Sequence, residues 1–363
     1  MGGTEVAGTN HRDFYAHCAD SNALKRYRER SMNEQSGNST EISPGTPAGV
    51  SVVLPILNEE RYLQDSVSAI LAQLYLGPIE VILALGPSMD RTDEIAQALA
   101  LKDPRVVLVE NPSGRTAAAL NRAVAASKYS IICRIDGHAE IAPTYIARAV
   151  TVMRETGAIN VGGIMAATGI GAFERAVATA MRSPLGVGAA RFHIGGKPGP
   201  ADTVYLGVFN KEALLASGGY DERFTRAQDW ELNFRLRRAG GTIWFDPELV
   251  VTYRPRPNLR ALAKQYFEYG RWRRAVSRNH RGTINFRYLA PPITVLITAL
   301  SILLGALVNP VLFLPAGLYL LGNLIGSFVI GKDWKEKIML PAILATMHFS
   351  WGIGFITSPK GLI

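Results

Sequence analysis

The chain has 363 residues, of which 48% are hydrophobic and 19% are charged. This composition excludes a disordered chain and is too apolar for an ordinary water-soluble surface. The formal net charge is +9, and residues 254–287 alone contain ten basic residues and one acidic residue. Because the rest of the chain is therefore neutral, we exclude a protein that coats nucleic acid and expect one localised basic segment.

Cysteine is rare, and the two cysteines are Cys18 and Cys133. They are too few for a disulfide framework or a zinc site made of thiolates, and they favour a reducing compartment. Residues 1–45 are rich in Gly, Ser, Thr and Asn and are predicted to form a disordered N-terminal tail. They contain no apolar run typical of a signal peptide, so we expect nothing there to direct export.

Residues 46–255 alternate between short apolar runs and helical patterns, beginning with the β-branched run at 49–55. Further strands are expected at 79–85, 105–109 and 130–135, and helices at 60–74, from about residue 90, and at 116–126. This order predicts an α/β domain with a mostly parallel sheet and helices on both faces. Ligands bind outside the carboxyl ends of such strands, so the polar residues that follow each strand are the candidates for chemistry.

Residues 289–363 are predicted to form a membrane domain. Residues 290–331 contain no charged side chain and are interrupted by Asn309-Pro310. Because about 20 apolar residues cross a bilayer core, we expect spans at about 290–308 and 311–331, and a third at 338–357. The flanking cations place the α/β domain on the cytoplasmic side by the positive-inside rule. The alternative is that these segments are core helices of a soluble protein.

Residues 256–288 form the basic segment, in which aromatic residues such as Tyr266 and Trp272 alternate with Lys and Arg. Such a pattern suits either nucleic acid or a membrane surface. Since it immediately precedes an apolar span, we favour an interfacial helix with its cations on lipid phosphates, and we expect no nucleic-acid partner.

Arg134-Ile135-Asp136-Gly137-His138 follows the fourth predicted strand directly. A carboxylate here suits a ribose hydroxyl or a divalent cation that bridges phosphates, and Gly137 permits a close approach of the backbone. His138 is a candidate second ligand, because imidazole suits manganese better than magnesium. The alternative is a simple turn in which Asp136 caps the next helix.

Gln228-Asp229-Trp230-Glu231 opens a helix that is predicted to run to Arg238. The helix dipole alone favours a carboxylate in this first turn, whereas the functional alternative makes Asp229 a general base for an acceptor hydroxyl. Arg115 lies between a glycine and a helix start, where backbone amides and a guanidinium suit a diphosphate. A solvent-exposed arginine is an equally consistent interpretation.

Six short motifs, taken in this order, resemble the family 2 glycosyltransferases with a GT-A fold over roughly residues 49–280. They are Val52–Pro55 with Asn58-Glu59-Glu60, Ser88–Thr92, Arg115–Asn121, Asp136–His138, Gly218–Glu222 and Gln228–Glu231. Residues 192–209 and the trailing apolar segments are most similar to the succinoglycan-biosynthesis glucosyltransferase subgroup. That likeness implies action on polyprenyl-diphosphate-linked sugars at the cytoplasmic membrane face.

The resemblance also implies a set of site residues. Those bordering the nucleotide sugar would be Pro55, Asn58, Glu59, Ser88, Asp90, Arg115, Asn121, Asp136 and Gly137. A divalent metal, Mn²⁺ or Mg²⁺, would be held by Asp136 and His138. Asp229 matches the catalytic base of inverting enzymes, and the acceptor or its diphosphate would meet Asp202, Trp230, Glu231, Arg271 and Trp272.

Three positions depart from the family pattern. Leu85-Gly86-Pro87 occupies the position where the family usually has an acid that recognises the nucleotide base. The resemblance therefore implies no specificity for uracil. His138 stands where the family usually has aspartate, which leaves the identity of the metal open. Gln228 replaces an acid beside Asp229, which removes like-charge repulsion and leaves Asp229 a more ordinary carboxylate.

The sequence therefore predicts a membrane-bound inverting glycosyltransferase of polysaccharide or cell-envelope glycan synthesis. It would move a sugar from a nucleoside-diphosphate sugar to a polyprenyl-diphosphate-linked sugar. Two alternatives stay open: direct transfer to polyprenyl phosphate, and a non-catalytic membrane assembly partner with a degenerate transferase domain. The prediction depends on Asp136 and Asp229 converging on one pocket that faces the cytosol beside the lipid.

Overall fold

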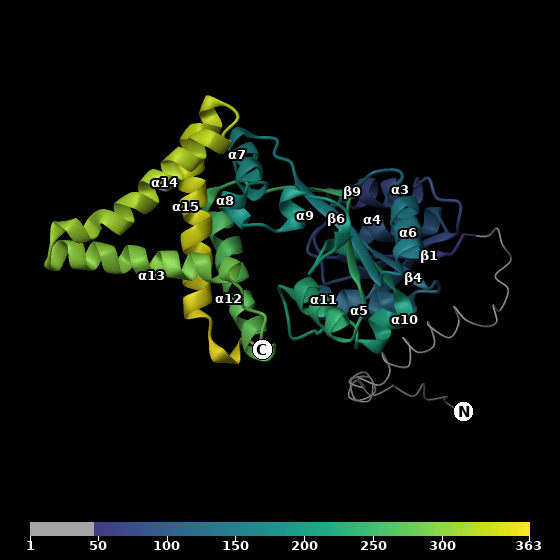
Figure 1. The fold of residues 1–363 in the computed structure, drawn as a ribbon. Helices are drawn as coiled ribbons and strands as arrows, with labels where there is room; N and C mark the ends of the chain where they lie inside the picture. The colour runs from purple at the N-terminus through teal and green to yellow at the C-terminus, as the bar shows by residue number, and fades with distance from the viewer. Residues whose placement is uncertain (1–46) are drawn as a thin grey trace, which may run out of the picture.

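The computed structural model describes residues 47–363, and the predicted tail 1–45 lies outside them. A layered α/β domain is followed across the molecule by a pair of long packed helices and a projecting helical hairpin (Figure 1). The first half of the α/β domain consists of β1 (Val50–Ile56), α3 (Leu63–Leu71), β2 (Ile79–Leu85), α4 (Thr92–Lys102), β3 (Val106–Glu110), α5 (Thr116–Ala126), β4 (Ile131–Arg134), β5 (Glu140–Ile141) and α6 (Tyr145–Thr156). The strands and helices predicted for this half are confirmed to within a few residues.

The second half of the domain contains shorter and less regular elements. It consists of β6 (Asn160–Ala167), α7 (Ala172–Met181), α8 (Pro184–Val187), α9 (Arg191–Ile194), β7 (Gly199–Pro200), β8 (Tyr205–Asn210), α10 (Lys211–Ala216), α11 (Gln228–Arg238) and β9 (Ile243–Tyr253). The helix predicted from Gln228 to Arg238 is confirmed with the same bounds.

The described strands form one mixed sheet in the order β3-β2-β1-β4-β8-β6-β9-β5, with β7 paired to β9. The first four strands are parallel, as predicted. Strand β8 runs antiparallel to both of its neighbours, β4 and β6, and β5 and β7 run antiparallel to β9. Strands β6 and β9 are again parallel to each other. The sheet is therefore mostly parallel as predicted, and β5, β7 and β8 depart from that arrangement because apolar periodicity does not encode strand direction.

Helices cover both faces of the sheet. Leu54 of β1 packs into a core with α3, α4 and α6, whereas its neighbour Val53 packs into a second core with α5, α10 and α11. Side chains alternate across a strand in this way, and Pro55 alone in β1 is not fully buried. The carboxyl ends of β1, β2 and β4 thus meet at one edge, where the loops that carry the predicted site residues begin.

Helix α12 (Leu259–Asn279) lies along α15 (Trp334–Thr357) and joins the α/β domain to the C-terminal helices (Figure 1). The two backbones touch at glycines. A Cβ on Gly270 would lie 2.0 Å from the Trp351 carbonyl oxygen, and one on Gly354 would lie 2.1 Å from that of Phe267. Side chains of α12 and α15 also share a core with α7.

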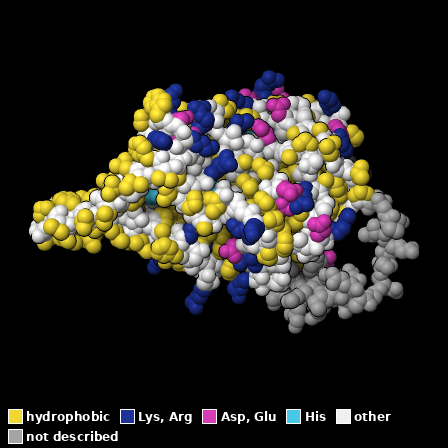
Figure 2. All heavy atoms as spheres, turned by 45° about the horizontal axis from the view of Figure 1, so that its top comes forward, with side chains coloured by type: hydrophobic (Ala, Val, Ile, Leu, Met, Phe, Trp, Pro, Cys, Tyr) yellow, Lys and Arg dark blue, Asp and Glu magenta, His cyan; other side chains and the backbone are white. Residues whose placement is uncertain are grey.

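Helices α13 (Phe286–Leu307) and α14 (Leu314–Ile330) form an apolar hairpin, joined by the short helix η1 (Pro310–Phe313); η2 (Lys360–Leu362) follows α15. Figure 2 shows hydrophobic side chains covering the part of this hairpin that projects from the molecule. Among the described residues, the segments 286–307, 310–330 and 334–357 are long and apolar enough to cross a membrane. They correspond to the three predicted spans.

The basic segment 256–288 folds mainly as α12. Leu262, Tyr266 and Trp272 are buried, while Lys264 is exposed. The helix is thus amphipathic: its packed side includes one buried cation, Arg273, and its other cations are partly or fully exposed.

Candidate active site

The loops after β1 and β2 are tied together by side chains. Asn58 has a left-handed backbone (φ 55°), and its Oδ1 accepts a hydrogen bond from the Met89 amide at 2.8 Å. The Asn58 amide in turn donates to Ser88 Oγ at 3.1 Å. Asparagine tolerates this backbone conformation better than most residues. Asn58 and Ser88 are therefore brought together beside Pro55, at the end of β1.

Asp90 also connects the loops after β1 and β2. Its Oδ1 accepts from the Thr92 hydroxyl at 2.5 Å, and its Oδ2 accepts from the Glu60 amide at 3.3 Å. The hydrogen bond from Thr92 is the main reason that the pKa of Asp90 lies below its ordinary value. Asp90 is thus an ionised carboxylate that shapes the loop.

Gly86 occupies the position where an acid is usual. A Cβ on Gly86 would lie 3.1 Å from the Ile56 carbonyl oxygen and 3.3 Å from Gly114 Cα. These distances are shorter than an ordinary van der Waals contact, so a side chain at residue 86 would require the backbone of Ile56 or Gly114 to shift by a few tenths of an ångström.

Arg134, the last residue of β4, lies between the two predicted acids. Its side chain is only 4% exposed, and its Nη2 lies 3.1 Å from Asp136 Oδ1. Its Nη1 donates to Asp229 Oδ1, in the first turn of α11. The side chains of Asp136 and Asp229 are 23% and 27% exposed. The two carboxylates therefore converge on one buried cation and remain accessible from solvent.

Local structure explains this convergence. Arg134 and Asp136 are two residues apart at the end of an extended segment, where side chains point the same way. Ala227 has a left-handed backbone (φ 60°) immediately before α11. This bend turns the chain into the helix and brings Asp229 to Arg134. The ring of Tyr220 lies 5.8 Å from the Arg134 guanidinium carbon and lines its other side.

The charges of this cluster are coupled. Burial raises the pKa of Asp229, while the Arg134 guanidinium acts in the opposite direction. Burial alone would lower the pKa of Arg134, but Asp229 and Asp136 raise it well above its ordinary value. Arg134 therefore stays charged, and the pKa of Asp229 moves toward the range in which a carboxylate serves as a general base.

His138 is oriented by Glu59, whose Oε1 lies 2.8 Å from His138 Nδ1. This hydrogen bond raises the pKa of His138, while burial and, to a smaller extent, the positive charge of Arg256 act in the opposite direction. Gly137 lets the two loops meet, because a Cβ there would lie 2.9 Å from Ile56 Cδ1 and 3.0 Å from Glu59 Cγ. Glu59, Asp136 and His138 are thus brought together at the ends of β1 and β4.

Asp136 and His138 are the side chains of this loop that could coordinate a divalent cation. A carboxylate on Nδ1 leaves Nε2 of His138 as the coordinating nitrogen, a common arrangement around metal-bound histidines. Asp136 directs Oδ1 to Arg134, so its second oxygen is the one left for a metal. Residues 47–363 contain no group of three or more His, Cys, Asp and Glu suited to a metal. Two protein ligands together with oxygens of a bound phosphate are an ordinary ligand set for Mg²⁺.

Asn121 serves a different place from the one predicted. Its Nδ2 donates to the Tyr220 carbonyl at 2.8 Å and to Glu222 at 3.0 Å, and its Oδ1 accepts from the Tyr220 amide at 2.8 Å. The side-chain amide is therefore fully engaged in joining α5 to the loop before α11. Arg115, the residue before α5, is exposed.

Trp230 and Glu231 follow Asp229 but face the packing around α11. Glu231 is 1% exposed and binds Arg235 at 2.7 Å and His280 at 2.9 Å. Trp230 stacks on Phe234. Both residues therefore position α11, and the structure does not place them beside Asp136.

Three other predicted acceptor residues lie apart from the carboxylate pair. Trp272 is 5% exposed and packs on Phe224, with ring centroids 6.0 Å apart. Arg271 pairs with Glu268 at 2.8 Å. Asp202 has a 76% exposed side chain and pairs with Arg237 at 3.2 Å. The structure does not bring these residues into contact with Asp136 or Asp229.

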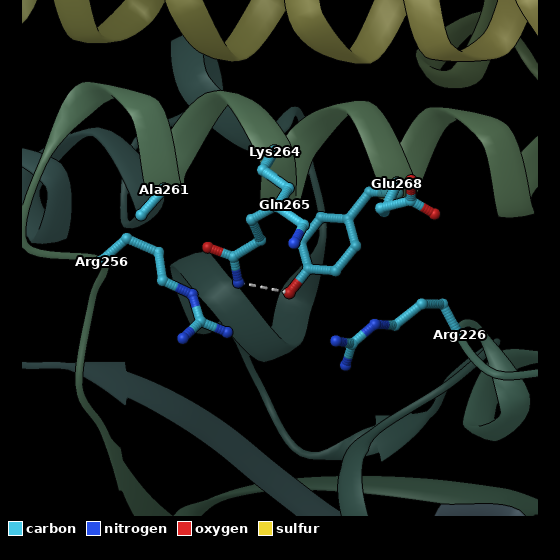
Figure 3. A pocket seen from close by; sticks show the side chains of 7 residues that line it. Arg226, Arg256, Ala261, Lys264, Gln265 and Glu268 are labelled. Atoms are coloured by element: carbon cyan, nitrogen blue, oxygen red, sulfur yellow. Dashed lines mark hydrogen bonds between the residues drawn. The ribbon is translucent and has the colours of Figure 1, made fainter. Parts of the chain in front are cut away.

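A cavity of about 270 Å³ lies beneath α12 (Figure 3). It is lined by Arg226, Arg256, Ala261, Lys264, Gln265, Glu268 and Tyr269. Arg226 precedes Asp229 by three residues, and Arg256 follows β9. The cavity therefore collects cations from three separate segments close to the candidate base.

Sequence reasoning missed Arg134 as a site residue and did not single out Arg226 or Arg256. Arg134 carried a usable signal, because a cation in an apolar strand two residues before an acid requires a partner when it is buried. Arg226 and Arg256 carried none, since single arginines in loops are usually solvent-exposed.

Comparison with known proteins gives a consistent result. Residues 51–215 match the sequence model of glycosyl transferase family 2. The chain is 35% identical over 310 residues to the succinoglycan biosynthesis protein ExoA of Rhizobium meliloti (strain 1021), covering 84% of this chain and 93% of that protein.

A second relative and a solved structure extend the comparison. Over 326 residues the chain is 23% identical to the dolichyl N-acetyl-alpha-D-glucosaminyl phosphate 3-beta-D-2,3-diacetamido-2,3-dideoxy-beta-D-glucuronosyltransferase of Methanococcus voltae, covering 86% of this chain and 97% of that protein. The mannosyltransferase PcManGT from Pyrobaculum calidifontis, solved with GDP-Man and Mn²⁺, superposes with a TM-score of 0.54 at 18% identity. That match covers 90% of this chain and 93% of the other, and it shows a shared fold.

Proposed function

This chain belongs to glycosyl transferase family 2, and on that premise we propose that it is an inverting, membrane-bound transferase acting at the cytoplasmic face. The donor is a nucleoside-diphosphate sugar, and the acceptor is a hydroxyl of a polyprenyl-diphosphate-linked sugar. The observation that carries the proposal is the position of Asp229. Its carboxylate is accessible, lies on the same buried cation as Asp136, and belongs to the loop cluster at the carboxyl ends of the strands.

The relatives support this choice of donor and acceptor. PcManGT was solved with GDP-Man and Mn²⁺, a nucleotide sugar and a divalent cation. The Methanococcus voltae relative is named for a sugar carried on dolichyl phosphate, and ExoA is named for the synthesis of a polysaccharide. The apolar C-terminal helices support a site next to a membrane, where a lipid-linked acceptor is found.

The residues of the site divide the chemistry among them. The acceptor oxygen attacks the anomeric carbon, its proton passes to the Asp229 carboxylate, and the bond from that carbon to the diphosphate breaks. Arg134 keeps Asp229 oriented and ionised by donating a hydrogen bond to it. Asn58, Ser88 and Asp90 shape the loops on the nucleotide side.

A divalent cation would be held by Asp136 and His138, with Glu59 fixing the imidazole. When bound, it supplies positive charge for the leaving diphosphate. Arg115, exposed before α5, supplies further positive charge at the nucleotide side. General-base assistance of the kind assigned to Asp229 contributes roughly 10²–10⁴-fold in rate.

A donor panel tests the proposed function. The purified full-length chain in detergent is given nucleoside-diphosphate sugars with Mn²⁺ or Mg²⁺ and a polyprenyl-diphosphate-linked sugar. Sugar incorporation into the lipid fraction and the released nucleoside diphosphate are measured. Transfer to the sugar-bearing lipid supports the proposal, and transfer only to bare polyprenyl phosphate replaces it with the lipid-phosphate alternative. Absence of binding and transfer for every donor favours the non-catalytic assembly partner.

A further inference from the structure

The cavity beneath α12 has the charge of an anion site. Arg226, Arg256 and Lys264 line it, and no ion pair or side-chain hydrogen bond joins the side chain of any of the three to another residue in the range 47–363. The one acid in the lining, Glu268, is engaged by Arg271 at 2.8 Å. The guanidinium groups of Arg226 and Arg256 face the same space from two sides (Figure 3). Unpaired cations around a cavity favour an anionic ligand.

The lining also offers hydrogen-bonding groups. Gln265 Nε2 donates to Tyr253 Oη at 2.6 Å and to Tyr269 Oη at 2.7 Å, which fixes the amide. Its Oε1 is buried and has no hydrogen-bond partner in the described part of the chain. An unsatisfied buried acceptor is costly, and a hydroxyl that entered the cavity would relieve it. The pocket therefore combines cations with an acceptor for a neutral donor, as a phosphorylated sugar requires.

The cavity is built from other segments than the loops on the nucleotide side, and it borders that side at Arg256, whose charge acts on His138. The loops that carry Asn58, Ser88 and Asp90 follow β1 and β2, whereas the cavity is built on α12, on Arg226 before α11 and on Arg256 after β9. Helix α12 packs directly on α15, one of the apolar C-terminal helices. The cavity is thus bounded by α12, which packs on α15, and by the loop that leads into α11 and the candidate base.

Resting on the proposed function, we propose that this cavity binds the diphosphate of the lipid-linked acceptor through Arg226, Arg256 and Lys264. The volume of about 270 Å³ lies near the lower end of the ~300–1,000 Å³ typical of small-ligand sites. With the diphosphate held here, the sugar attached to it is presented toward Asp229, three residues beyond Arg226. The pocket selects acceptors that carry their sugar on a diphosphate over neutral glycolipids.

Binding of geranyl diphosphate to the full-length chain in detergent tests the pocket without turnover. We expect binding of geranyl diphosphate and none of geraniol, with Arg226→Gln and Arg256→Gln each weakening it by about tenfold to a hundredfold, the value of a lost charge-assisted hydrogen bond. Arg260→Gln is the matched control, because Arg260 is an exposed cation of α12 outside the lining. An equal loss in Arg260→Gln overturns the proposal.

Competition and kinetics distinguish the possible sources of the diphosphate. Saturating nucleoside diphosphate is expected to leave geranyl diphosphate binding intact, and displacement would reassign the cavity to the donor. In transfer assays the two variants should raise KM for the lipid acceptor and not KM for the donor. If the variants are active and their KM for the acceptor is unchanged, the proposed pocket is contradicted and the proposed function is not. If geranyl diphosphate binds but no transfer activity is found, the proposed function is contradicted and the pocket is not.

An independent observation concerns how α15 meets the membrane. Helix α15 lies lengthwise along α12, which carries several charged side chains, among them Arg271, Arg274 and Arg278. Charged groups are expensive in the hydrocarbon core. A bilayer-spanning α15 would take its neighbour α12 with these charges into the membrane.

Both ends of α15 are bonded to helices on the side of the α/β domain. Near its start, Glu336 Oε2 accepts a hydrogen bond from the Thr179 hydroxyl of α7 at 3.1 Å. Just beyond its end, Arg278 of α12 donates to the carbonyl oxygens of Ser358 and Pro359 at 2.6 and 2.7 Å. A helix held by α7 at its start and by α12 at its end stays on the side of the α/β domain and does not carry the chain across a bilayer.

The geometry points to α13 and α14 as the membrane-crossing pair, with α15 lying along the lipid surface. Figure 1 shows the α13–α14 hairpin extending away from α15, which runs crosswise at its base. The chain then crosses the membrane twice, and its last residues lie on the same side as the α/β domain. This differs from the third span that length and composition predict for 338–357.

Labelling of single cysteines with a membrane-impermeant maleimide tests this arrangement in sealed vesicles of both orientations. In a chain with Cys18 and Cys133 replaced, Lys360→Cys is compared with Lys102→Cys on α4 and Val308→Cys at the hairpin turn, all exposed positions. We expect Lys360→Cys and Lys102→Cys to be labelled from the same side of the membrane, and Val308→Cys to be labelled from the opposite side. Labelling of Lys360→Cys with Val308→Cys overturns the proposal, as does labelling of all three from one side. Detergent-opened vesicles give the control in which every position reacts.

Discussion

The Asp229 carboxylate accepts a hydrogen bond from Arg134, although 95 residues separate them in the chain. Arg134 also binds Asp136, so one buried guanidinium links the end of β4 to the first turn of α11. Removing one partner of a buried ion pair strongly destabilises a protein. The fold therefore holds the two carboxylates close to each other through Arg134.

Replacing the candidate base tests its role directly. Asp229→Asn keeps the shape of the side chain and removes its capacity to take a proton. We expect kcat to fall by about 10²–10⁴-fold while KM for the donor is nearly unchanged, because the donor loops lie at other strands. Transfer kinetics measure kcat and KM, and thermal melting shows whether the variant is folded. Wild-type turnover in this variant would remove Asp229 from the mechanism.

The charge of Arg134 is expected to set the pH dependence of the reaction. Burial raises the pKa of Asp229 and Arg134 opposes that rise, so removing the cation in Arg134→Gln lets the pKa rise further. A base is active when deprotonated, so the acid limb of the kcat profile should move to higher pH. A profile measured on folded protein with an unmoved acid limb would contradict this. Arg134→Lys, which keeps a positive charge, serves as the comparison.

Glu59 is expected to act through His138. Glu59→Gln removes the carboxylate that fixes Nδ1 of the imidazole. We expect the Mn²⁺ concentration for half-maximal activity to rise about 10–100-fold, the usual effect of losing such an orienting partner. Direct Mn²⁺ binding measured by electron paramagnetic resonance gives a readout independent of turnover. Glu60→Gln, a neighbouring exposed acid, is the control and should leave binding unchanged.

Glu231 is expected to contribute to stability in a pH-dependent way. Burial alone would raise its pKa, but hydrogen bonds from His280 and Arg235 lower it below the ordinary value. A carboxyl with a lowered folded-state pKa stabilises the protein above its unfolded-state pKa, and this stabilisation is lost as pH falls through the folded-state value. Glu231→Gln should therefore cost about 1–3 kcal/mol at neutral pH.

The same variant should also change the shape of the acid unfolding curve. Because the side-chain amide in Glu231→Gln does not titrate, the loss of stability between neutral pH and the folded-state pKa of Glu231 should be shallower than in the unaltered chain. Denaturant unfolding at a series of pH values measures this. Parallel curves for the two proteins would show that Glu231 titrates alike in the folded and unfolded chains.

The predicted strands and helices match the structure because their signals are local. The β-branched run at 49–55 becomes β1 of a sheet covered on both faces, and the pattern from Gln228 to Arg238 becomes α11 with the same bounds. Strand direction is not local, and the antiparallel course of β8 was therefore beyond the reach of periodicity. The long apolar segments were predictable for the same reason that strands were, since length and hydropathy are properties of short stretches.

For the candidate site, too, some features were predictable from the sequence and others were not. Asp136, His138 and Asp229 were predicted from their positions after a strand and at a helix start, and the structure places Asp136 and Asp229 on one cation. Asn121 and Glu231 were expected at the ligand and instead hold the loop before α11 and the helix itself. Their residue types suit both tasks, and only their neighbours in space distinguish the two.

By itself, the order of strands, helices, acids and apolar segments determined the fold class, the family and the two carboxylates, because each of these depends on residues close together in the chain. Only the tertiary structure decided that Arg134 joins those carboxylates, that Arg226, Arg256 and Lys264 line one cavity, and that α15 is bonded to α7 near its start and to α12 beyond its end. Each of these depends on segments that are distant in the chain and meet only when the sheet and α12 are packed, since a side chain's electrostatic partners are set by distance in space.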